Sequence, residues 1–310
     1  MEKIVSIIIP VYNEEASLPH FHEQLTKITS QIEGYQWELI YVNDGSTDGT
    51  QRILEQLYQQ CPQASFILLS RNFGKEQAML AGFDHAKGQC AIVMDADLQD
   101  PPELINDMLD CWEQGYEDVY AKRRSRGKES WLRRKLTMQF YNILDRSTNF
   151  RVLKNVGDFR LLDRKCIDAL KTLREQERYT KGLYCWIGFK KKELLFDRGN
   201  RLYGKSHWNL LQLTALAIEG ITSFTTMPLR LATLVGFITG IGAIIYMIWK
   251  FIKVLIWGDP VAGFPTLIIV ILFLGSTQLI CMGILGEYIG RIFNESKQRP
   301  NYLVSEYRHH

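Results

Sequence analysis

The stretch CAIVMDADLQD, residues 90–100, joins an apolar run to a cluster of carboxylates. The apolar run predicts a buried β-strand, and carboxylates at i and i+2 of an extended chain point the same way. Asp95 and Asp97 have this spacing. Oxygen ligands so placed suit Mg²⁺ or Mn²⁺, which bind through one or two carboxylates plus substrate phosphates. The alternative is a turn before a helix, because DPPE at 100–103 is typical of a helix start.

Strand and helix patterns alternate on either side of this stretch. Strands are predicted at 4–9, 37–42, 66–69 and 90–94, and helices at 14–32, 47–60, 76–86 and 103–114. Such alternation predicts an α/β domain with a mainly parallel sheet. Further strands are predicted at 159–162 and 193–196.

A polar segment follows each of the first four predicted strands, at residues 10–14, 43–49, 70–75 and 95–100. In open α/β sheets, ligands bind outside the carboxyl ends of the strands. Four polar loops at one edge therefore predict a binding cleft. No G-x-G-x-x-G follows the first strand, and the P-loop motif is missing from the sequence. A dinucleotide oxidoreductase and a P-loop NTPase are thus both disfavoured.

Two long runs without charge, 231–249 and 261–286, lie near the end of the chain. A helix needs about 20 apolar residues to cross a bilayer, so both runs predict spans, with two buried core helices as the alternative. The expected division is a catalytic domain at 1–228, two transmembrane helices within 229–290 (about 230–254 and 263–286) and a tail at 291–310.

The orientation in the membrane follows from the flanking charges. The first residues lack the pattern of a signal peptide, so the catalytic domain and the tail are both expected in the cytoplasm of a multi-pass inner-membrane protein. Basic residues after the second span fit the positive-inside rule, whereas Lys250 and Lys253 argue mildly against it. Amphipathic helices are expected on the membrane surface at about 131–147 and 207–227.

The 310-residue chain carries a net charge of +3, and its basic residues crowd into the segment 122–135. Such a segment suits anionic lipid headgroups or a ligand that bears phosphate, although a solvated basic face is the alternative. The six cysteines form no C-x-x-C pair, which is typical of reduced, structural cysteines. Nothing in the charge pattern calls for a nucleic-acid partner, and a homo-oligomer is left open.

The cleft residues suit a nucleotide-diphosphate sugar. Asp44 and Asp95 are placed to accept hydrogen bonds from a ribose or a base, and Asp97 and Gln99 could hold the metal. A metal that bridges a diphosphate neutralises the charge that develops as the diphosphate leaves.

Five motifs in order resemble family 2 glycosyltransferases of GT-A fold. They are IIIPVYNE at 7–14, VNDGSTDGT at 42–50, SRNFGKE at 70–76, DADLQDPPE at 95–103 and RLYGKS at 201–206. The match is closest to the polyprenyl-phosphate glycosyltransferase branch, which includes dolichol-phosphate mannose synthases and bactoprenol glucosyltransferases. The resemblance implies metal-dependent, inverting transfer of one sugar from a nucleotide donor to a polyprenyl phosphate such as undecaprenyl phosphate.

The resemblance also implies roles for individual residues. Those expected to line the nucleotide-sugar site are Pro10, Tyr12, Glu14, Asp44, Lys75 and Asp95. Asp97 and Gln99 would hold Mg²⁺ or Mn²⁺, and the donor and acceptor phosphates would meet Arg123, Arg134, Arg201 and Lys205. The catalytic set is expected to comprise Asp97, Arg201 and Asp158, with Asp158 as a base, a group that orients the sugar or merely a turn residue.

A phosphate acceptor is already anionic at neutral pH, so it needs positioning more than a strong base. Glucose from UDP-glucose is the leading donor, with GlcNAc, galactose and mannose donors as alternatives. A processive polysaccharide synthase is weakened by the presence of only two clear spans and the lack of a Q-x-x-R-W motif. A non-catalytic membrane scaffold is the alternative of another class, and the intact Asp95 and Asp97 pair argues against it.

Overall fold

The computed structural model of the protein describes residues 2–124, 153, 156–196, 227–257 and 263–310. Three of the predicted site residues, Arg134, Arg201 and Lys205, lie outside these ranges. The interface helices expected at 131–147 and 207–227 also lie outside them, apart from Met227.

The described chain forms an eight-stranded sheet in the order β7-β5-β6-β4-β1-β2-β3-β8. The strands are β1 (Lys3–Val11), β2 (Tyr35–Asn43), β3 (Ala64–Leu69), β4 (Cys90–Val93), β5 (Asp118–Arg123), β6 (Val156–Asp163), β7 (Lys191–Phe196) and β8 (Val304–Arg308). The central strands β4, β1, β2 and β3 are parallel, whereas β6 and β8 run antiparallel to their neighbours. The predicted α/β class with a mainly parallel sheet is confirmed.

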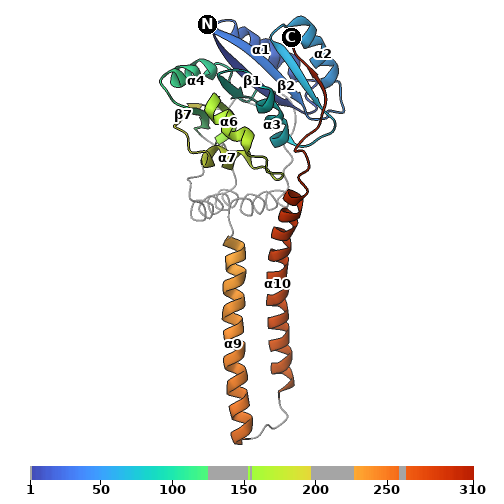
Figure 1. Ribbon diagram of the computed structural model, residues 1–310, viewed down its shortest axis with the longest axis vertical. Helices are drawn as coiled ribbons and strands as arrows, with labels where there is room; N and C mark the ends of the chain where they lie inside the picture. Colours follow the sequence, from blue (N-terminus) through green and yellow to red (C-terminus); the bar gives the residue numbers. More distant parts are fainter. Residues whose placement is uncertain (1, 125–152, 154–155, 197–226, 258–262) are drawn as a thin grey trace.

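Helices cover both faces of the sheet (Figure 1). They are α1 (Leu18–Thr29), α2 (Thr50–Gln60), α3 (Lys75–His85), α4 (Leu104–Glu113), α6 (Arg164–Thr172) and α7 (Thr180–Trp186). Side chains of β1 alternate between the two layers: Ile7 and Ile9 pack with α1, α2 and α4, and Ile8 packs with α3, α6 and α7. This alternation is the two-residue period of a strand that is buried on both faces.

Helix α3 lies unusually close to the sheet because it carries small residues. A Cβ atom on Gly82 would come 2.2 Å from Cγ2 of Ile8, so a side chain at this position would push the helix away. Ala78 and Ala81 of the same helix are also fully buried. The close approach brings the first residue of α3, Lys75, to the carboxyl ends of the strands.

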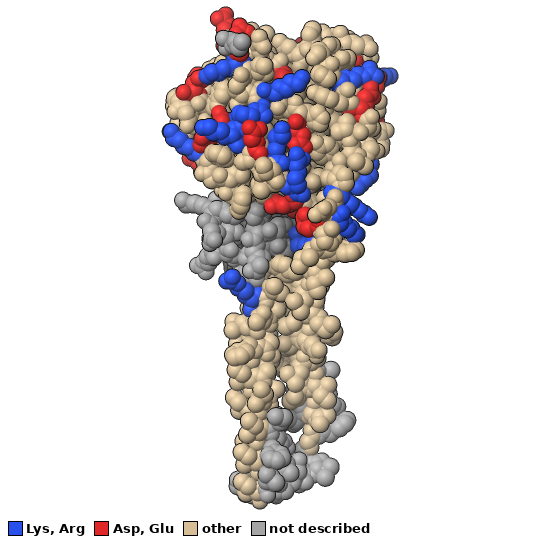
Figure 2. Space-filling view, in the orientation of Figure 1, with Lys and Arg blue, Asp and Glu red and all other residues tan. Residues whose placement is uncertain are grey.

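Two long helices, α9 (Met227–Trp257) and α10 (Phe264–Ser296), extend side by side away from the α/β domain (Figure 1). Figure 2 shows charged side chains gathered on the domain and an almost uncharged described surface over most of this hairpin. Among the described residues, one stretch is long and apolar enough to cross a membrane, Pro228–Tyr246 of α9. The second predicted span, 263–286, falls within α10 and stays a prediction.

The end of the chain returns from the hairpin to the sheet. Residues 291–310, expected as a tail, contain the last turns of α10 and the strand β8. Strand β8 pairs antiparallel with β3, where Tyr307 lies opposite Ile67. Both ends of the hairpin are therefore joined to the same domain.

A buried charge cluster holds the antiparallel half of the sheet together. Arg160 of β6 is 1% exposed and lies 3.2 Å from Asp118 of β5, which is fully buried. Lys191 of β7 lies 2.9 Å from the same carboxylate, and the Arg160 guanidinium stacks 3.7 Å above the ring of Tyr184. The cluster therefore links three strands and α7.

Replacing the arginine should leave Asp118 buried with one partner instead of two. Because breaking a buried ion pair typically costs about 3–5 kcal/mol, we expect Arg160→Met to lower the midpoint of thermal unfolding in detergent markedly. Lys3→Met is the control, since it removes the exposed Lys3–Glu113 pair at 2.6 Å, which should cost at most about 1 kcal/mol. Equal midpoints for the two variants would contradict the structural role of the cluster.

Candidate active site

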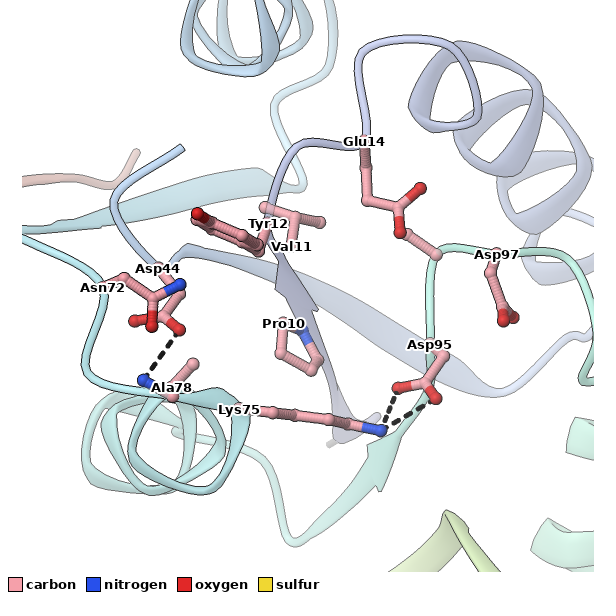
Figure 3. Close-up of a pocket in the computed structure, with 12 residues that line it drawn as sticks. Pro10, Val11, Tyr12, Glu14, Asp44, Asn72, Lys75, Ala78, Asp95 and Asp97 are labelled. Carbon is pink, nitrogen blue, oxygen red and sulfur yellow. Dashed lines mark hydrogen bonds and ion pairs between the residues drawn. The ribbon is translucent and has the colours of Figure 1, made fainter. Parts of the chain in front are cut away.

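A cleft opens at the carboxyl ends of β1, β2 and β4 (Figure 3). Its lining includes all six residues predicted for the nucleotide-sugar site, Pro10, Tyr12, Glu14, Asp44, Lys75 and Asp95, together with Asp97. These residues come from the end of β1, from the loops after β1, β2 and β4, and from the start of α3, and they are separated by up to 87 positions in the sequence. Parallel strands bring their carboxyl ends to one edge, and that edge is where the predicted cleft lies.

Asp44 fixes the loop after β3 to the loop after β2. It is 3% exposed, and its two carboxylate oxygens accept hydrogen bonds from the backbone N–H groups of Phe73 (2.7 Å) and Gly74 (2.9 Å). Burial raises the pKa of the Asp44 carboxyl above its ordinary value, and these two N–H donors oppose the rise. The carboxylate is thus held in place at the wall of the cleft.

The glycine after Asp44 permits this contact. Gly45 has a φ of +67°, and a Cβ there would lie 2.4 Å from the backbone carbon of Arg71. Any other residue would be strained by this left-handed conformation and would also separate the two loops. The sequence motif around Asp44 therefore has a steric basis as well as a chemical one.

The loop after β1 is locked to the same region by backbone and side-chain hydrogen bonds. The side-chain oxygen of Asn13 accepts from the N–H of Thr47 at 2.8 Å, and the N–H of Asn13 donates to Ser46 Oγ at 2.9 Å. The N–H of Glu14 donates to Thr50 Oγ1 at 2.9 Å. The first two polar loops therefore form one rigid wall, from which Tyr12 is 46% exposed.

Lys75 forms the centre of the charge arrangement in the cleft. Its Nζ lies 2.6 Å from Asp95 and 2.8 Å from Asp158, and Figure 3 shows its side chain extended from α3 toward Asp95. Burial alone would lower the pKa of the Lys75 ammonium, but the charges of Asp95 and Asp158 outweigh burial and raise it. Lys75 therefore remains positively charged between two carboxylates.

The pairing of β4 with β6 explains why Asp158 lies beside the cleft. Val93 lies opposite Arg160 in this antiparallel pair. Asp95, two residues after Val93, and Asp158, two residues before Arg160, therefore lie near each other, and both contact Lys75. Burial would raise the pKa of Asp158, yet the charges of Lys75 and Lys181 lower it to about 2. Its Oδ2 faces both lysines, with Lys181 Nζ at 3.9 Å, whereas its buried Oδ1 has no hydrogen-bond partner in the described chain.

The acidic stretch after β4 turns sharply instead of continuing as a strand. Strand β4 ends at Val93, and Leu98 adopts a left-handed φ of 59°. Asp95 and Asp97 follow a strand as predicted, but the expectation that the chain stays extended from Asp95 to Asp97 is wrong, because Ala96 and Asp97 lie in a turn. Both carboxylates nevertheless line the cleft. The N–H of Gln99 donates to Asp97 Oδ1 at 3.1 Å, and the buried Oε1 of Gln99 is without a hydrogen-bond partner among the described residues.

Two further ionisable residues lie beside the cleft, Asp100 of the acidic stretch and Lys181, and sequence spacing does not predict Lys181. Asp100 is 6% exposed, and burial together with the charges of Asp95 and Asp97 raises its pKa to about 7. Lys181 is the second residue of α7, and its Nζ lies 3.9 Å from Asp158 Oδ2. No motif signals Lys181, because only the packing of α7 brings it near β6. Arg123, predicted to meet phosphate, lies at the end of β5, and its charge opposes the rise in the pKa of Asp100.

Comparison with known proteins agrees with this geometry. Residues 6–171 match the family Glycosyl transferase family 2, and residues 227–292 match the GtrB C-terminal hairpin. An uncharacterized glycosyltransferase of Synechocystis sp. is 44% identical over 302 residues, which cover 97% of this chain and 95% of that protein.

Two further relatives have more specific names. The bactoprenol glucosyl transferase of Shigella phage SfV is 40% identical over 300 residues, which cover 97% of each chain. The prophage bactoprenol glucosyl transferase homolog of Escherichia coli (strain K12) is 39% identical over 300 residues, which cover 97% of this chain and 98% of that protein. The matched segments include both the cleft and the hairpin, and the chain therefore belongs to glycosyl transferase family 2, as its motifs predict.

Proposed function

We propose that the protein transfers glucose from UDP-glucose to a polyprenyl phosphate, such as undecaprenyl phosphate, at the cytoplasmic face of the membrane. One observation carries the proposal: relatives named bactoprenol glucosyl transferase match nearly the whole chain, and the match includes both the polar cleft and the apolar hairpin. GlcNAc, galactose or mannose donors are the alternatives, since nothing in the described cleft selects the sugar.

The hairpin would hold the cleft at the surface of the bilayer. Large apolar side chains of both helices are exposed, including Phe237 at 67% and Leu279 at 71%. Surfaces of this kind are stable against lipid chains and unfavourable in water. In this proposal α9 and α10 are the two transmembrane helices, residues 1–228 form the cytoplasmic catalytic domain, and the polyprenyl chain stays in the bilayer.

The wall formed by the first two loops would bind the nucleotide. Asp44 is fixed by two backbone donors and still has lone pairs directed to the cleft, so it can accept from a base or a ribose. The half-exposed ring of Tyr12 offers a flat apolar surface next to it. Pro10, Glu14 and Asp95 would complete the donor site, while Lys75 keeps Asp95 in place.

The acidic stretch fits a divalent cation of the Mg²⁺ type. Asp97 and the unpartnered Oε1 of Gln99 supply hard oxygen donors two residues apart. No group of three or more His, Cys, Asp or Glu residues in the described ranges could hold a metal ion. Mg²⁺ usually takes one or two protein carboxylates and completes its coordination with water and substrate phosphates. When bound, such a cation would neutralise charge on the leaving diphosphate.

The chain's own residues would align two anions. The acceptor phosphate oxygen would attack the anomeric carbon from the face opposite the leaving UDP, which inverts the configuration at that carbon. Basic side chains reduce the repulsion between the acceptor and the diphosphate, and arginine binds phosphate through two parallel hydrogen bonds. Arg123 is the described candidate, and Arg134, Arg201 and Lys205 are proposed for the same role.

Asp158 would orient the sugar rather than remove a proton. With a pKa of about 2 it is ionised at any physiological pH and is a weak base. Its Oδ2 contacts Lys75, which lines the cleft, so Asp158 would orient the sugar through that lysine.

The transfer assay tests the proposal directly. Purified protein in detergent, with Mg²⁺ or Mn²⁺, undecaprenyl phosphate and labelled nucleotide sugars, should give butanol-extractable label from UDP-glucose. Asp97→Asn, or chelation of the metal, should reduce the rate at least about a hundredfold, because charge on the leaving diphosphate is then poorly compensated. Lys3→Met, far from the cleft, should retain the rate.

Lipid-linked label from another donor would reassign the sugar. No label from any donor, with folded protein and dispersed acceptor, would contradict the proposed reaction. Binding of UDP without turnover would then favour the scaffold alternative.

The pH dependence of the transfer rate distinguishes whether Asp158 acts as a general base or as a group that orients the sugar. The second pKa of a phosphate monoester is about 6, so the transfer rate should fall as the pH drops below that value and the acceptor gains a proton. Asp158 itself has a lowered pKa, so its ion pairs persist above about pH 4 and weaken only as the pH falls toward 2. Asp158→Asn should therefore be slower yet keep the same acid limb. Loss of that limb in the variant would identify Asp158 as the titrating base.

A further inference from the structure

The α6–α7 loop, residues 173–179, lies between the cleft and the membrane hairpin. It joins α6 to α7, and α7 begins with Thr180 and Lys181. The loop has no role in the reaction as proposed so far. Its hydrogen bonds nevertheless connect two elements that the reaction must keep aligned.

One side of the loop is held by the end of α10. Glu177 pairs with Arg291 at 2.5 Å and accepts from the side-chain amide of Asn294 at 3.1 Å. The N–H of Gln176 donates to the Glu295 carboxylate at 2.7 Å. Three successive polar contacts therefore fix the loop to the last turns of the hairpin helix.

The other side of the loop is held by the start of α3. The carbonyl oxygen of Gln176 accepts from the side-chain amide of Gln77 at 3.0 Å. The N–H of Thr180 donates to the Glu76 carboxylate at 3.0 Å. Glu76 directly follows Lys75, and Thr180 directly precedes Lys181, so both anchored residues are neighbours of lysines that contact Asp158.

We propose that the α6–α7 loop is a positioning element, which couples the end of α10 to Lys181 and Asp158 and, through Lys75, to the cleft. The inference rests on the proposed function, because an acceptor held in the bilayer must meet a donor held in the cleft. An error of about 1 Å in such an alignment can cost a factor of about a hundred in rate. The loop would hold the Asp158 carboxylate at a fixed position relative to the hairpin, beside which the polyprenyl phosphate would bind.

In this scheme Lys181 is a positioning residue and not a catalytic one. Its ammonium lies 3.9 Å from Asp158 Oδ2, on the oxygen that Lys75 already contacts at 2.8 Å. Two cations on Oδ2 fix the orientation of the Asp158 carboxylate beside the cleft. Movement of the loop would displace Lys181 first and the orientation of Asp158 with it.

A pair of matched variants tests the role of the loop. Arg291 pairs with Glu177 of the loop and also with Glu287, one turn earlier in its own helix, at 3.1 Å. Glu177→Ala should lower kcat for lipid transfer about tenfold, normalised to UDP-binding sites, and change the KM for UDP-glucose less than about twofold. Glu287→Ala removes a partner of the same arginine without touching the loop and should leave kcat unchanged.

Two combinations separate positioning from simple loss of structure. The charge exchange Glu177→Arg with Arg291→Glu should recover most of the activity that either single change removes. Lys181→Ala should lower kcat like Glu177→Ala, Lys181→Arg should recover most of it, and adding Glu177→Ala to Lys181→Ala should cause little further loss, because residues on one path are not additive.

Three results would overturn the inference in a protein that transfers sugar: equal kcat for Glu177→Ala and Glu287→Ala, fully additive losses for Glu177 and Lys181, or a parallel fall in UDP affinity. Absence of transfer by the unchanged protein is a different result. It would contradict the proposed function itself, and the inference that rests on it.

Discussion

The cleft depends on one pair of contacts, in which the ammonium of Lys75 lies between the carboxylates of Asp95 and Asp158. Without it, two carboxylates at the ends of neighbouring strands would repel each other in a partly buried site. Lys75 can reach both because α3 lies close to the sheet, where Gly82 faces Ile8 with no room for a side chain. One lysine thus makes the position of α3, the turn after β4 and the start of β6 depend on one another.

One face of strand β6 bears two charged side chains, one beside the cleft and one in the core. Asp158, Arg160 and Leu162 are two residues apart and point to the side of the sheet covered by α3, α6 and α7. Asp158 meets the lysines at the edge, and Arg160 is buried against Asp118 and Tyr184 further along. Burying these charges is costly unless each is paired, so the network specifies how β5, β6 and β7 pack.

The hairpin and the catalytic domain are joined at more than one place. The chain enters the hairpin at Met227, and after α10 it returns to the sheet as β8 beside β3. The α6–α7 loop of the domain also contacts the end of α10, where Glu177 pairs with Arg291 and the N–H of Gln176 donates to Glu295. These contacts fix the domain against the end of the hairpin, which suits the proposed reaction between a ligand in water and a ligand in lipid.

The α/β class, six of the eight described strands and six residues of the cleft wall could be predicted from sequence alone, whereas β5 and β8 were missed. Those predictions depend on local patterns, namely apolar runs and the polar motifs that follow them, and parallel strands necessarily bring such motifs to one edge. The tertiary structure was needed to show that Asp158 lies near Asp95, that Lys181 approaches Asp158, and that β8 pairs with β3 at the edge of the sheet. These contacts join residues from 23 to more than 200 positions apart through antiparallel pairing and helix packing. The alternation of apolar residues in a strand determines which face it buries, but it does not identify the distant strand with which it pairs, because that choice depends on the packing of the whole core.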